Sequence, residues 1–374
     1  MNPAESNPKN RKVTKMGANI VVGGFWGDEG KGLVSAWQAF KDHSLGVFRG
    51  CGGSNPEHGL FFGSNYIKTN QLPLGFIFSG TLIGLGPGTA VNVEKFIAEV
   101  KRFRIPTEKV RVDPNCPIIT PENVQEETFS ASMDAIGSTK SGTGIAMSHA
   151  ALRIAPLARD IAALQTYLAD IPELANDLAE RGTINLESTQ GTFLSRYHGE
   201  YPNVTSVDVT APSVIAGVGL NWRLVENVIV CVKALPTREG TGPMGDVAEF
   251  TLEEMQSLGI VEYSSIVDPK TGQHEIRRKA KGIDYSLLTR IIKLNGANQI
   301  ALTFAEHYDP EVRDVRQWSQ LTGKIKNLIG EIEQQTGIEV TLVNTGKQWT
   351  SMVSKYEDLP AISDSLLARL QSFC

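Results

Sequence analysis

The sequence has 374 residues, a net charge of −5 and 41% hydrophobic residues, enough apolar material for one large domain or two ordinary ones. The acidic balance argues against a protein that binds a nucleic-acid polymer through its overall charge, and no apolar run reaches the ~20 residues of a membrane span. Residues 1–17 are polar and predict a flexible N-terminal tail without a signal peptide, followed by a single domain over residues 18–374. The scattered cysteines form no metal-binding spacing, which predicts reduced thiols and a cytoplasmic protein.

A glycine-rich loop follows the first predicted strand. Residues 20–22 form an apolar run that predicts a buried strand, and residues 33–40 have a helical pattern. The glycines between them let backbone N–H groups approach an anion at the start of a helix, beside Asp28 and Lys31. The loop predicts a phosphate site with its own acid–base group, although Gly32 stands where the usual phosphate loop has Ser or Thr. A plain glycine-rich turn is the alternative.

Two more loops have a similar composition. Residues 45–48 predict a strand that runs into the glycine-rich residues 49–59, which contain His58. Residues 136–144 (IGSTKSGTG) are rich in hydroxyl groups and glycine, which suits wrapping a phosphate with side-chain and backbone donors; a surface loop is the alternative. The pattern of residues 157–178 predicts a helix with a break at Pro172.

The second half continues the alternation of strands and helices. A strand beginning at residue 184 leads into a polar turn with Gln190, whose amide can both donate to and accept from a base edge. Residues 276–282 are the densest basic cluster, either a solvated charge run or a site for a dicarboxylate or phosphate. Further strands are predicted at residues 225–234, 299–304 and, as the terminal one, 339–343, with helices at 93–103 and 321–336. This order predicts an α/β fold with a central, mostly parallel β-sheet flanked by helices.

Several separated motifs resemble one family, the adenylosuccinate synthetases, from residue 19 to about residue 353. The matching motifs are WGDEGKG (26–32), GGSNPEH (52–58), TQGT (189–192), HGEYPNVTS (198–206), TR (237–238), GP (242–243), QTG (335–337) and NTG (344–346). The resemblance implies the fold of that family, which is similar to phosphate-loop NTPases. It also implies a ligase that joins L-aspartate to the 6-position of a purine nucleoside monophosphate, using Mg²⁺ and a nucleoside triphosphate.

The resemblance also implies a role for individual residues. The γ-phosphoryl group moves to the purine O6, and the aspartate amine then displaces phosphate. Asp28 matches the base that removes the N1 proton and also contacts the metal. His58 matches the residue that stabilises the transferred phosphoryl group, and Gln190 matches the side chain that holds the 6-oxo edge.

Binding residues follow from the same match. Donor phosphates are assigned to Gly27, Gly30, Lys31 and Gly32, and the donor base to Glu306 and Gly346. The acceptor nucleotide is assigned to Asn55, Ser138, Thr139, Arg153, Gln190 and Thr205. The aspartate carboxylates are assigned to Arg277 and Lys279 on a mobile basic loop, and the metal to Asp28 and the backbone carbonyl of Glu57. Arg153 matches an arginine supplied across a two-fold interface, which implies a homodimer with shared active sites.

The chain also departs from the common enzyme of the family. TFAE (303–306) stands where that enzyme reads guanine with TKLD, and Lys347 replaces a Pro. A mismatch at a buried base edge changes binding by roughly 1–3 kcal/mol, enough to reverse a preference between GTP and ATP. On the acceptor side, Asp208 adds an acceptor-only carboxylate, which would suit a purine with a 2-amino group.

These departures resemble the phage branch of the family. The favoured reaction is dGMP plus L-aspartate with ATP or dATP to 2-amino-2′-deoxyadenylosuccinate, on the path to diaminopurine DNA in a host cytoplasm. Some phage members replace the base Asp with Ser, whereas Asp28 is kept here. The alternatives are an ordinary synthetase that uses IMP and GTP, and a catalytically silent nucleotide-binding protein, against which the retained Asp28, Lys31, His58 and Gln190 argue.

Overall fold

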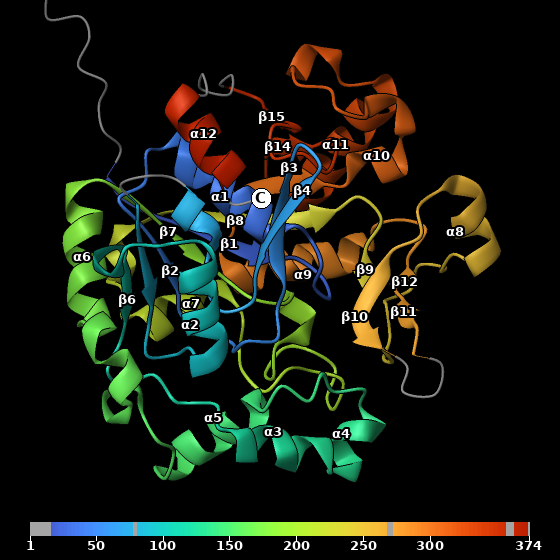
Figure 1. Ribbon diagram of the computed structural model, residues 1–374. Coiled ribbons are helices and arrows are strands. Elements are labelled where there is room, and N and C mark those ends of the chain that lie inside the picture. The colour runs from blue at the N-terminus through green and yellow to red at the C-terminus, as the bar shows by residue number, and fades with distance from the viewer. Residues whose placement is uncertain (1–15, 78–80, 268–271, 357–362, 373–374) are drawn as a thin grey trace, which may run out of the picture.

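A nine-stranded sheet forms the centre of the computed structural model, which describes residues 16–77, 81–267, 272–356 and 363–372 (Figure 1). From edge to edge the strands are β15 (Met352–Ser354), β14 (Val340–Asn344), β13 (Gln299–Thr303), β8 (Val225–Lys233), β1 (Gly17–Gly23), β7 (Thr183–Glu187), β2 (Gly46–Arg49), β5 (Leu82–Leu85) and β6 (Val110–Val112). Neighbours from β14 to β6 pair in parallel, and β15 pairs antiparallel with β14. The predicted mostly parallel sheet is confirmed.

Helices cover both faces of this sheet, and the side chains of each strand alternate between two cores. Ile20 and Val22 of β1 pack on one side and Val21 on the other, because successive strand residues point to opposite faces. The helices on the first side are α6 (Ile171–Arg181), α7 (Ala211–Val218), α9 (Tyr285–Asn295) and α11 (Gly323–Thr336). The other side carries α1 (Lys31–Lys41), α2 (Val93–Arg102) and α12 (Asp364–Ser372). Both cores pack against the same nine-stranded sheet, and this shared sheet supports the proposal of a single domain over residues 18–374.

Smaller elements surround the carboxyl ends of the strands. At the bottom of Figure 1 lie α3 (Pro121–Thr128), α4 (Ala131–Ala135) and α5 (Thr143–Leu152). At its right lie α8 (Leu252–Leu258), the hairpin of β10 (Tyr263–Val267) and β11 (His274–Ile276), and the pair of β9 (Thr237–Arg238) and β12 (Arg278–Lys279). A hairpin of β3 (His58–Phe62) and β4 (Asn65–Thr69) stands over the centre, and α10 (Ala305–Tyr308) follows β13. No helix in the described ranges is both long and apolar enough to cross a membrane.

The predicted helix over residues 157–178 with a break at Pro172 is wrong. Residues 158–160 and 162–167 form short 3₁₀ turns, and Pro172 lies in the first turn of α6. Proline suits this position because its fixed φ is helical and a first-turn residue needs no N–H partner. The side chain of Asp170 caps the same helix by accepting from the backbone N–H of Glu173 at 2.9 Å.

Two other boundaries differ from the sequence-based ones. The tail is predicted over residues 1–17. Residues 1–15 lie outside the described residues, and Gly17 already belongs to β1. The strand predicted at residues 339–343 is β14, but β15 and α12 follow it. Neither difference changes the positions of the glycine-rich loops. They follow β1 and β2 at the carboxyl edge of the parallel strands, where α/β sheets bind ligands.

Candidate active site

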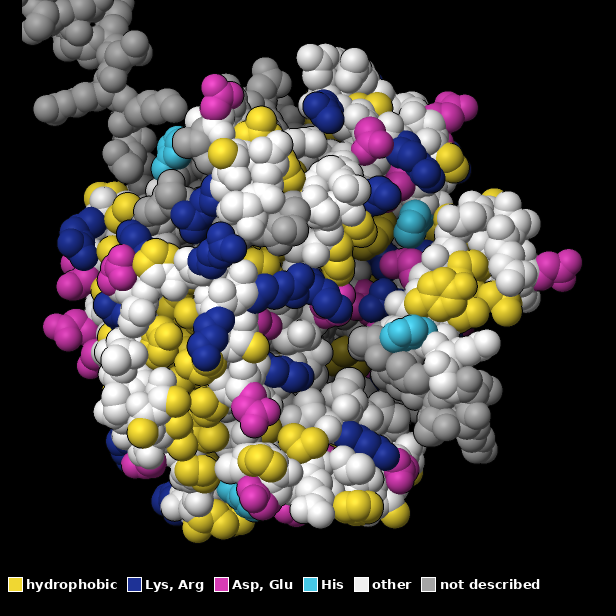
Figure 2. Space-filling view, in the orientation of Figure 1, with side chains coloured by type: hydrophobic (Ala, Val, Ile, Leu, Met, Phe, Trp, Pro, Cys, Tyr) yellow, Lys and Arg dark blue, Asp and Glu magenta, His cyan; other side chains and the backbone are white. Residues whose placement is uncertain are grey.

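A cavity of about 800 Å³ opens at this carboxyl edge. Figure 2 shows Lys and Arg side chains gathered across the centre of the face where it opens. Most of the predicted site residues line it: Gly27, Asp28, Gly30, Lys31, Gly32, Asn55, Glu57, His58, Ser138, Thr139, Gln190, Thr205 and Arg277. Those that do not line it are Arg153, Lys279, Glu306 and Gly346.

The loop after β1 is shaped by the buried carboxylate of Glu29. One of its oxygens accepts from the backbone N–H groups of Phe25 and Gly27 at 3.0 and 2.8 Å, and the other accepts from Lys31 Nζ at 2.8 Å. Burial opposes the charge on Lys31, but Glu29 raises the pKa of this lysine above its ordinary value. Gly30 is the N-cap of α1 at φ 71° and provides no capping side chain. The first-turn N–H groups of α1 thus remain available to an anion, beside a cationic Lys31.

Asp28 lies on the cavity wall in an ion pair. Its backbone is left-handed, with φ 63°, a conformation that Asp tolerates better than most residues. Its carboxylate is 2.9 Å from the guanidinium of Arg277, which also contacts Glu239 at 3.0 Å. These carboxylates raise the pKa of Arg277 even though burial opposes its charge. The structure therefore brings Asp28 and Arg277 together at one point of the cavity.

Three predicted site residues have buried polar atoms without a partner among the described residues. These atoms are both amide atoms of Gln190, Oδ1 of Asn55 and Nε2 of His58. All three side chains line the cavity, and Gln190 also has a left-handed backbone with φ 48°. Buried polar groups are nearly always paired, so unpaired ones that converge on a cavity indicate a polar ligand.

The loop at residues 136–144 uses its backbone donors differently from the sequence-based interpretation. The carboxylate of Glu127 accepts from the N–H groups of Gly142, Gly144 and Ile145 at 2.6, 2.7 and 3.3 Å. A protein carboxylate, and not a phosphate, therefore occupies the amides at the start of α5. Ser138 and Thr139 still line the cavity.

Lys279 does not reach the cavity. Its side chain is fully buried, with Nζ 2.5 Å from Glu262 and 3.2 Å from Nδ1 of His307. Glu262 also binds Lys233 at 2.6 Å, and burial lowers the pKa of Lys279 to about 8. This buried network occupies the ammonium group of Lys279, so in this structure the lysine is not part of the cavity wall. Arg277 alone of the two faces the cavity.

Two further predicted residues lie outside the cavity of their own chain. Arg153 is exposed at the C-cap of α5, between Leu152 and Ile154, which are 64% and 66% exposed. Gly346 is buried, and its carbonyl accepts from the side chain of Asn344 at 2.6 Å. An exposed Arg153 is available to another molecule, whereas Gly346 is enclosed by its own chain.

Asp208 cannot read a purine 2-amino group in this structure. Its carboxylate accepts from the hydroxyl groups of Ser195 and Thr210 at 2.7 and 2.8 Å, and it does not line the cavity. These contacts tie the turn before α7 to the loop after β7. The role expected of Asp208 from its charge is therefore wrong, since local hydroxyl groups occupy its oxygens.

Glu306 is a buried carboxyl group two residues after the cavity-lining Phe304. It is 8% exposed, Oε2 has no partner among the described residues, and burial raises its pKa to about 7. Its ordinary pKa is 4.5, so its contribution to stability is present below pH 4.5 and is lost as the pH rises through about 7.

We therefore expect Glu306→Gln to raise the melting temperature by about 3–4 °C at pH 8, and by less than about 1 °C at pH 5. The glutamine keeps the volume but carries no charge to bury. Differential scanning calorimetry of parent and variant at both pH values measures the difference. An equal shift at both values would contradict a strained carboxylate at this position.

A magnesium ion fits the oxygen atoms of this cavity. Among the described residues, no group of three or more His, Cys, Asp or Glu side chains forms a metal cage. Mg²⁺ is commonly held by one or two protein oxygens together with phosphates and water. Asp28 and Glu57 both line the cavity, and the carboxylate of Asp28 with the proposed backbone carbonyl of Glu57 would match that preference.

Some site residues escaped the sequence analysis. Arg238, Glu239 and Glu262 also line the cavity. Arg238 donates to the carbonyls of Thr241 and Asn203 at 2.9 and 2.8 Å and so holds two cavity loops together. The TR motif at residues 237–238 marked this place, but nothing local indicated that the arginine is buried.

Comparisons with known proteins give the family. A family model described as adenylosuccinate synthetase matches residues 20–165 and 153–310. The adenylosuccinate synthetase of Methanocaldococcus jannaschii is 38% identical over 354 residues, which covers 93% of this chain and 100% of that protein. That of Archaeoglobus fulgidus is 37% identical over 340 residues, with 90% and 98% covered.

Solved structures agree with this fold. The fully ligated adenylosuccinate synthetase from Plasmodium falciparum superposes with a TM-score of 0.81 at 18% identity, covering 91% of this chain and 100% of that one. The succinoaminodeoxyadenylate synthetase of cyanophage S-2L, bound to dGMP and dATP, superposes with a TM-score of 0.75 at 25% identity, covering 96% and 98%. Enzymes of the family act on small molecules and use a nucleoside triphosphate and Mg²⁺. This chain belongs to the adenylosuccinate synthetase family and is a carbon–nitrogen ligase of that type.

Proposed function

We propose that this ligase joins L-aspartate to C6 of dGMP, with ATP or dATP as phosphoryl donor, to give 2-amino-2′-deoxyadenylosuccinate. The observation that carries the ligase site is the amide of Gln190, buried and unpaired at the cavity wall. The backbone of Gln190 also comes close to the loop that carries Asp28. A Cβ atom added to Gly27, the residue before Asp28, would lie 3.9 Å from Cα of Gln190. An amide that can both donate and accept suits the 6-oxo and N1 edge of a purine, with a carboxylate next to it.

The residues then have separate chemical tasks. Asp28 accepts the N1 proton, so that O6 attacks the γ-phosphorus while the bond to the leaving diphosphate breaks. Lys31 and the N-terminus of α1 hold the donor phosphates, and His58 faces the transferred group. The aspartate amine then attacks C6, and the C6–O6 bond breaks to release phosphate. A magnesium ion at Asp28 and the Glu57 carbonyl would neutralise phosphate charge.

Arg277 is the proposed contact for the aspartate carboxylates. Its guanidinium already binds two carboxylates of the protein, Asp28 and Glu239. L-Aspartate carries two carboxylates of the same kind, and a guanidinium pairs with carboxylates through parallel hydrogen bonds. We expect the substrate to take over Arg277 and thereby free Asp28 for proton transfer.

Three observations support the choice of dGMP and an adenine donor. Phe304 and Lys347 replace the residues with which the common enzyme encloses guanine. Glu306 does not line the cavity, but it lies two residues after Phe304, which does. Burial raises the pKa of Glu306 to about 7, so near neutral pH this carboxyl group can donate as well as accept, which suits adenine better than the donor-rich edge of guanine. The cyanophage S-2L relative was solved with dGMP and dATP.

The alternative is the ordinary reaction of IMP, L-aspartate and GTP. The names of the archaeal relatives favour it, and Asp208, occupied by Ser195 and Thr210, gives no support to a 2-amino purine. The test incubates the protein with L-aspartate, Mg²⁺ and either dGMP or IMP, each with ATP, dATP or GTP. Product formation from dGMP with ATP or dATP supports the proposal, and turnover of IMP with GTP alone rejects it. No turnover with any pair would favour a silent nucleotide-binding protein.

The active site is proposed to be completed across a homodimer. Arg153 is exposed between two exposed apolar residues and cannot serve the cavity of its own chain. An exposed apolar patch around an arginine is typical of a protein interface, with arginine as its anchor.

For the dimer we expect Arg153→Leu to raise the KM for the acceptor nucleotide at least about tenfold, since a charge-assisted contact to phosphate is worth about 1.5–3 kcal/mol. Steady-state kinetics measures this. An equimolar mixture of Arg153→Leu and Asp28→Ala protein should regain part of the activity, because mixed dimers hold one site with both residues. If subunit exchange is shown and the mixture, at an acceptor concentration below the KM of Arg153→Leu, is no more active than its Arg153→Leu component alone, the shared site is rejected.

A further inference from the structure

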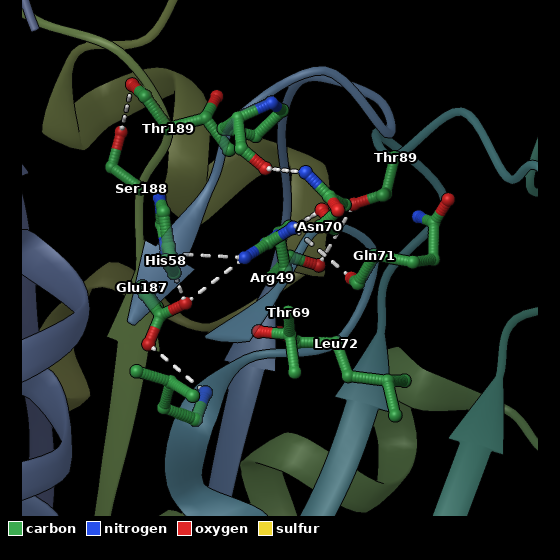
Figure 3. Close-up of polar contacts among 12 residues, drawn as sticks. Arg49, His58, Thr69, Asn70, Gln71, Leu72, Thr89, Glu187, Ser188 and Thr189 are labelled. Carbon is green, nitrogen blue, oxygen red and sulfur yellow. Dashed lines mark hydrogen bonds and ion pairs between the residues drawn. The ribbon is translucent and has the colours of Figure 1, made fainter. Parts of the chain in front are cut away.

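Behind His58 lies a buried ion pair that takes no part in the chemistry described so far. Arg49 and Glu187 end strands β2 and β7, and both side chains are 0% exposed. Nη2 of Arg49 is 3.0 Å from Oε1 of Glu187, and Nδ1 of His58 is 2.5 Å from the same oxygen. Figure 3 shows the three side chains converging, with the imidazole of His58 against the carboxylate. Neither Arg49 nor Glu187 lines the cavity.

Arg49 holds this arrangement in place. Its Nη1 donates to the carbonyls of Asn70 and Gln71 at 2.7 and 3.0 Å, which anchors it to the segment after β4 (Figure 3). The second oxygen of Glu187 accepts from the N–H of Leu74 at 3.4 Å. Although burial opposes it, His58 and Arg49 lower the pKa of Glu187 to about 2, so this carboxylate is ionised and can only accept hydrogen bonds.

The consequence falls on the ring of His58. Nδ1 of His58 also lies 3.2 Å from Nη2 of Arg49, which can only donate, but its contact with Glu187 is much shorter, at 2.5 Å. Because an ionised carboxylate has no proton to give, this shorter contact requires the proton on Nδ1 of the imidazole. Nε2 is then the ring nitrogen left for a ligand, and it is buried and unpaired in a side chain that lines the cavity. His58 packs directly against the first turn of α1. A Cβ atom added to Gly32 in that turn would lie only 2.8 Å from Cβ of His58.

A structural role alone explains the pair poorly. Two buried charges lose much of their hydration, and apolar residues of similar volume often stabilise a protein as well or better. The same logic of a buried carboxylate that fixes a histidine tautomer operates in the Ser-His-Asp triad, where the wrong tautomer lowers kcat by about 10⁴-fold.

We propose that Glu187, held by Arg49, is a positioning residue that keeps a proton on Nδ1 of His58 and turns Nε2 toward the transferred phosphoryl group, whose negative charge favours a second proton on Nε2 that donates to a phosphoryl oxygen. The fixed tautomer follows from the contacts above. That the ligand of Nε2 is the transferred phosphoryl group rests on the proposed function.

The tautomer is tested first, on the ligand-free protein. Histidine labelled with ¹⁵N reports which ring nitrogen carries the proton, and a His58→Gln sample identifies the signal among six histidines. We expect a proton on Nδ1 in the parent protein and a mixture of tautomers in Glu187→Gln, since the new amide can also donate to Nδ1. A parent His58 protonated on Nε2 alone would overturn the proposal. This experiment needs no turnover, so it stands apart from the proposed function.

Kinetics then tests the positioning role. Glu187→Gln should lower kcat about 10²-fold or more and change both nucleotide KM values less than about threefold, because Glu187 does not touch the cavity. The matched control is Glu99→Gln. Glu99 is a buried carboxylate that accepts from the N–H groups of Asn70, Gln71 and Leu72, the same segment that Arg49 anchors, without touching His58.

The two variants separate positioning from support of the fold. We expect Glu99→Gln to lower the melting temperature and keep the parent tautomer and kcat. If Glu187→Gln retains the parent kcat, or if Glu99→Gln loses as much kcat as Glu187→Gln at equal melting temperature, the positioning role is rejected. Should Glu187→Gln not fold, the measurement on the parent protein still decides the tautomer.

Discussion

Replacing Asp28 by alanine is expected to lower kcat by at least about 10³-fold while both nucleotides still bind. A positioned general base contributes typically 10²–10⁴-fold, and Asp28 is assigned a second task at the metal. The phosphate loop is organised by Glu29 and Lys31 and stays intact without the Asp28 side chain. Steady-state kinetics gives kcat, and calorimetric titration with the acceptor and with a non-hydrolysable donor gives the affinities.

The backbone at Asp28 calls for a second variant. Its φ of 63° is left-handed, which Asn tolerates and Ala does not. Asp28→Asn removes the charge and keeps this backbone, so it should be as inactive as Asp28→Ala and should melt closer to the parent protein. Turnover near the parent level in Asp28→Asn would refute Asp28 as the base.

Removing the guanidinium of Arg277 is expected to raise the KM for L-aspartate about 10²-fold, with the nucleotide KM values changed much less. Truncating one partner of a hydrogen-bonded charge pair costs about 2–5 kcal/mol, and 2.8 kcal/mol corresponds to about 10²-fold. Arg277→Leu has a neighbouring control in Arg278→Leu. Arg278 binds Glu249 and the carbonyl of Gly242 and does not line the cavity.

Initial rates at varied aspartate concentration measure this effect in both variants. Arg277→Lys adds a test of geometry, because lysine keeps the charge but loses the fork of parallel donors. We expect Arg277→Lys to recover a small part of the aspartate affinity. An aspartate KM that is unchanged in Arg277→Leu, or equally raised in Arg278→Leu, would contradict the assignment.

Much of the fold was predictable because it depends on local patterns. Apolar runs at residues 20–22 and 225–234 become the adjacent parallel strands β1 and β8, and the pattern of residues 33–40 becomes α1. Parallel strands direct their carboxyl ends to one edge, so the loops that follow β1, β2 and β7 meet there. The order of strands across the sheet follows from tertiary packing and could not be read from the pattern.

The errors concern side chains whose partners are distant or already occupied. The sequence shows that Lys279 is basic, but not that Glu262 and His307 enclose it. Asp208 is a free carboxylate in the sequence and a bound one in the fold. Glu187 carries no local signal at all, since its partners Arg49 and His58 are 138 and 129 positions away.

The central claim is that the purine O6 is phosphorylated before aspartate displaces it. The most direct measurement uses dGMP labelled with ¹⁸O at the 6-oxo position, together with L-aspartate, Mg²⁺ and unlabelled ATP. The proposed sequence transfers that oxygen to the released phosphate, so mass spectrometry should find one ¹⁸O atom in each phosphate molecule formed. Phosphate without ¹⁸O, formed together with the aspartate adduct, would contradict it.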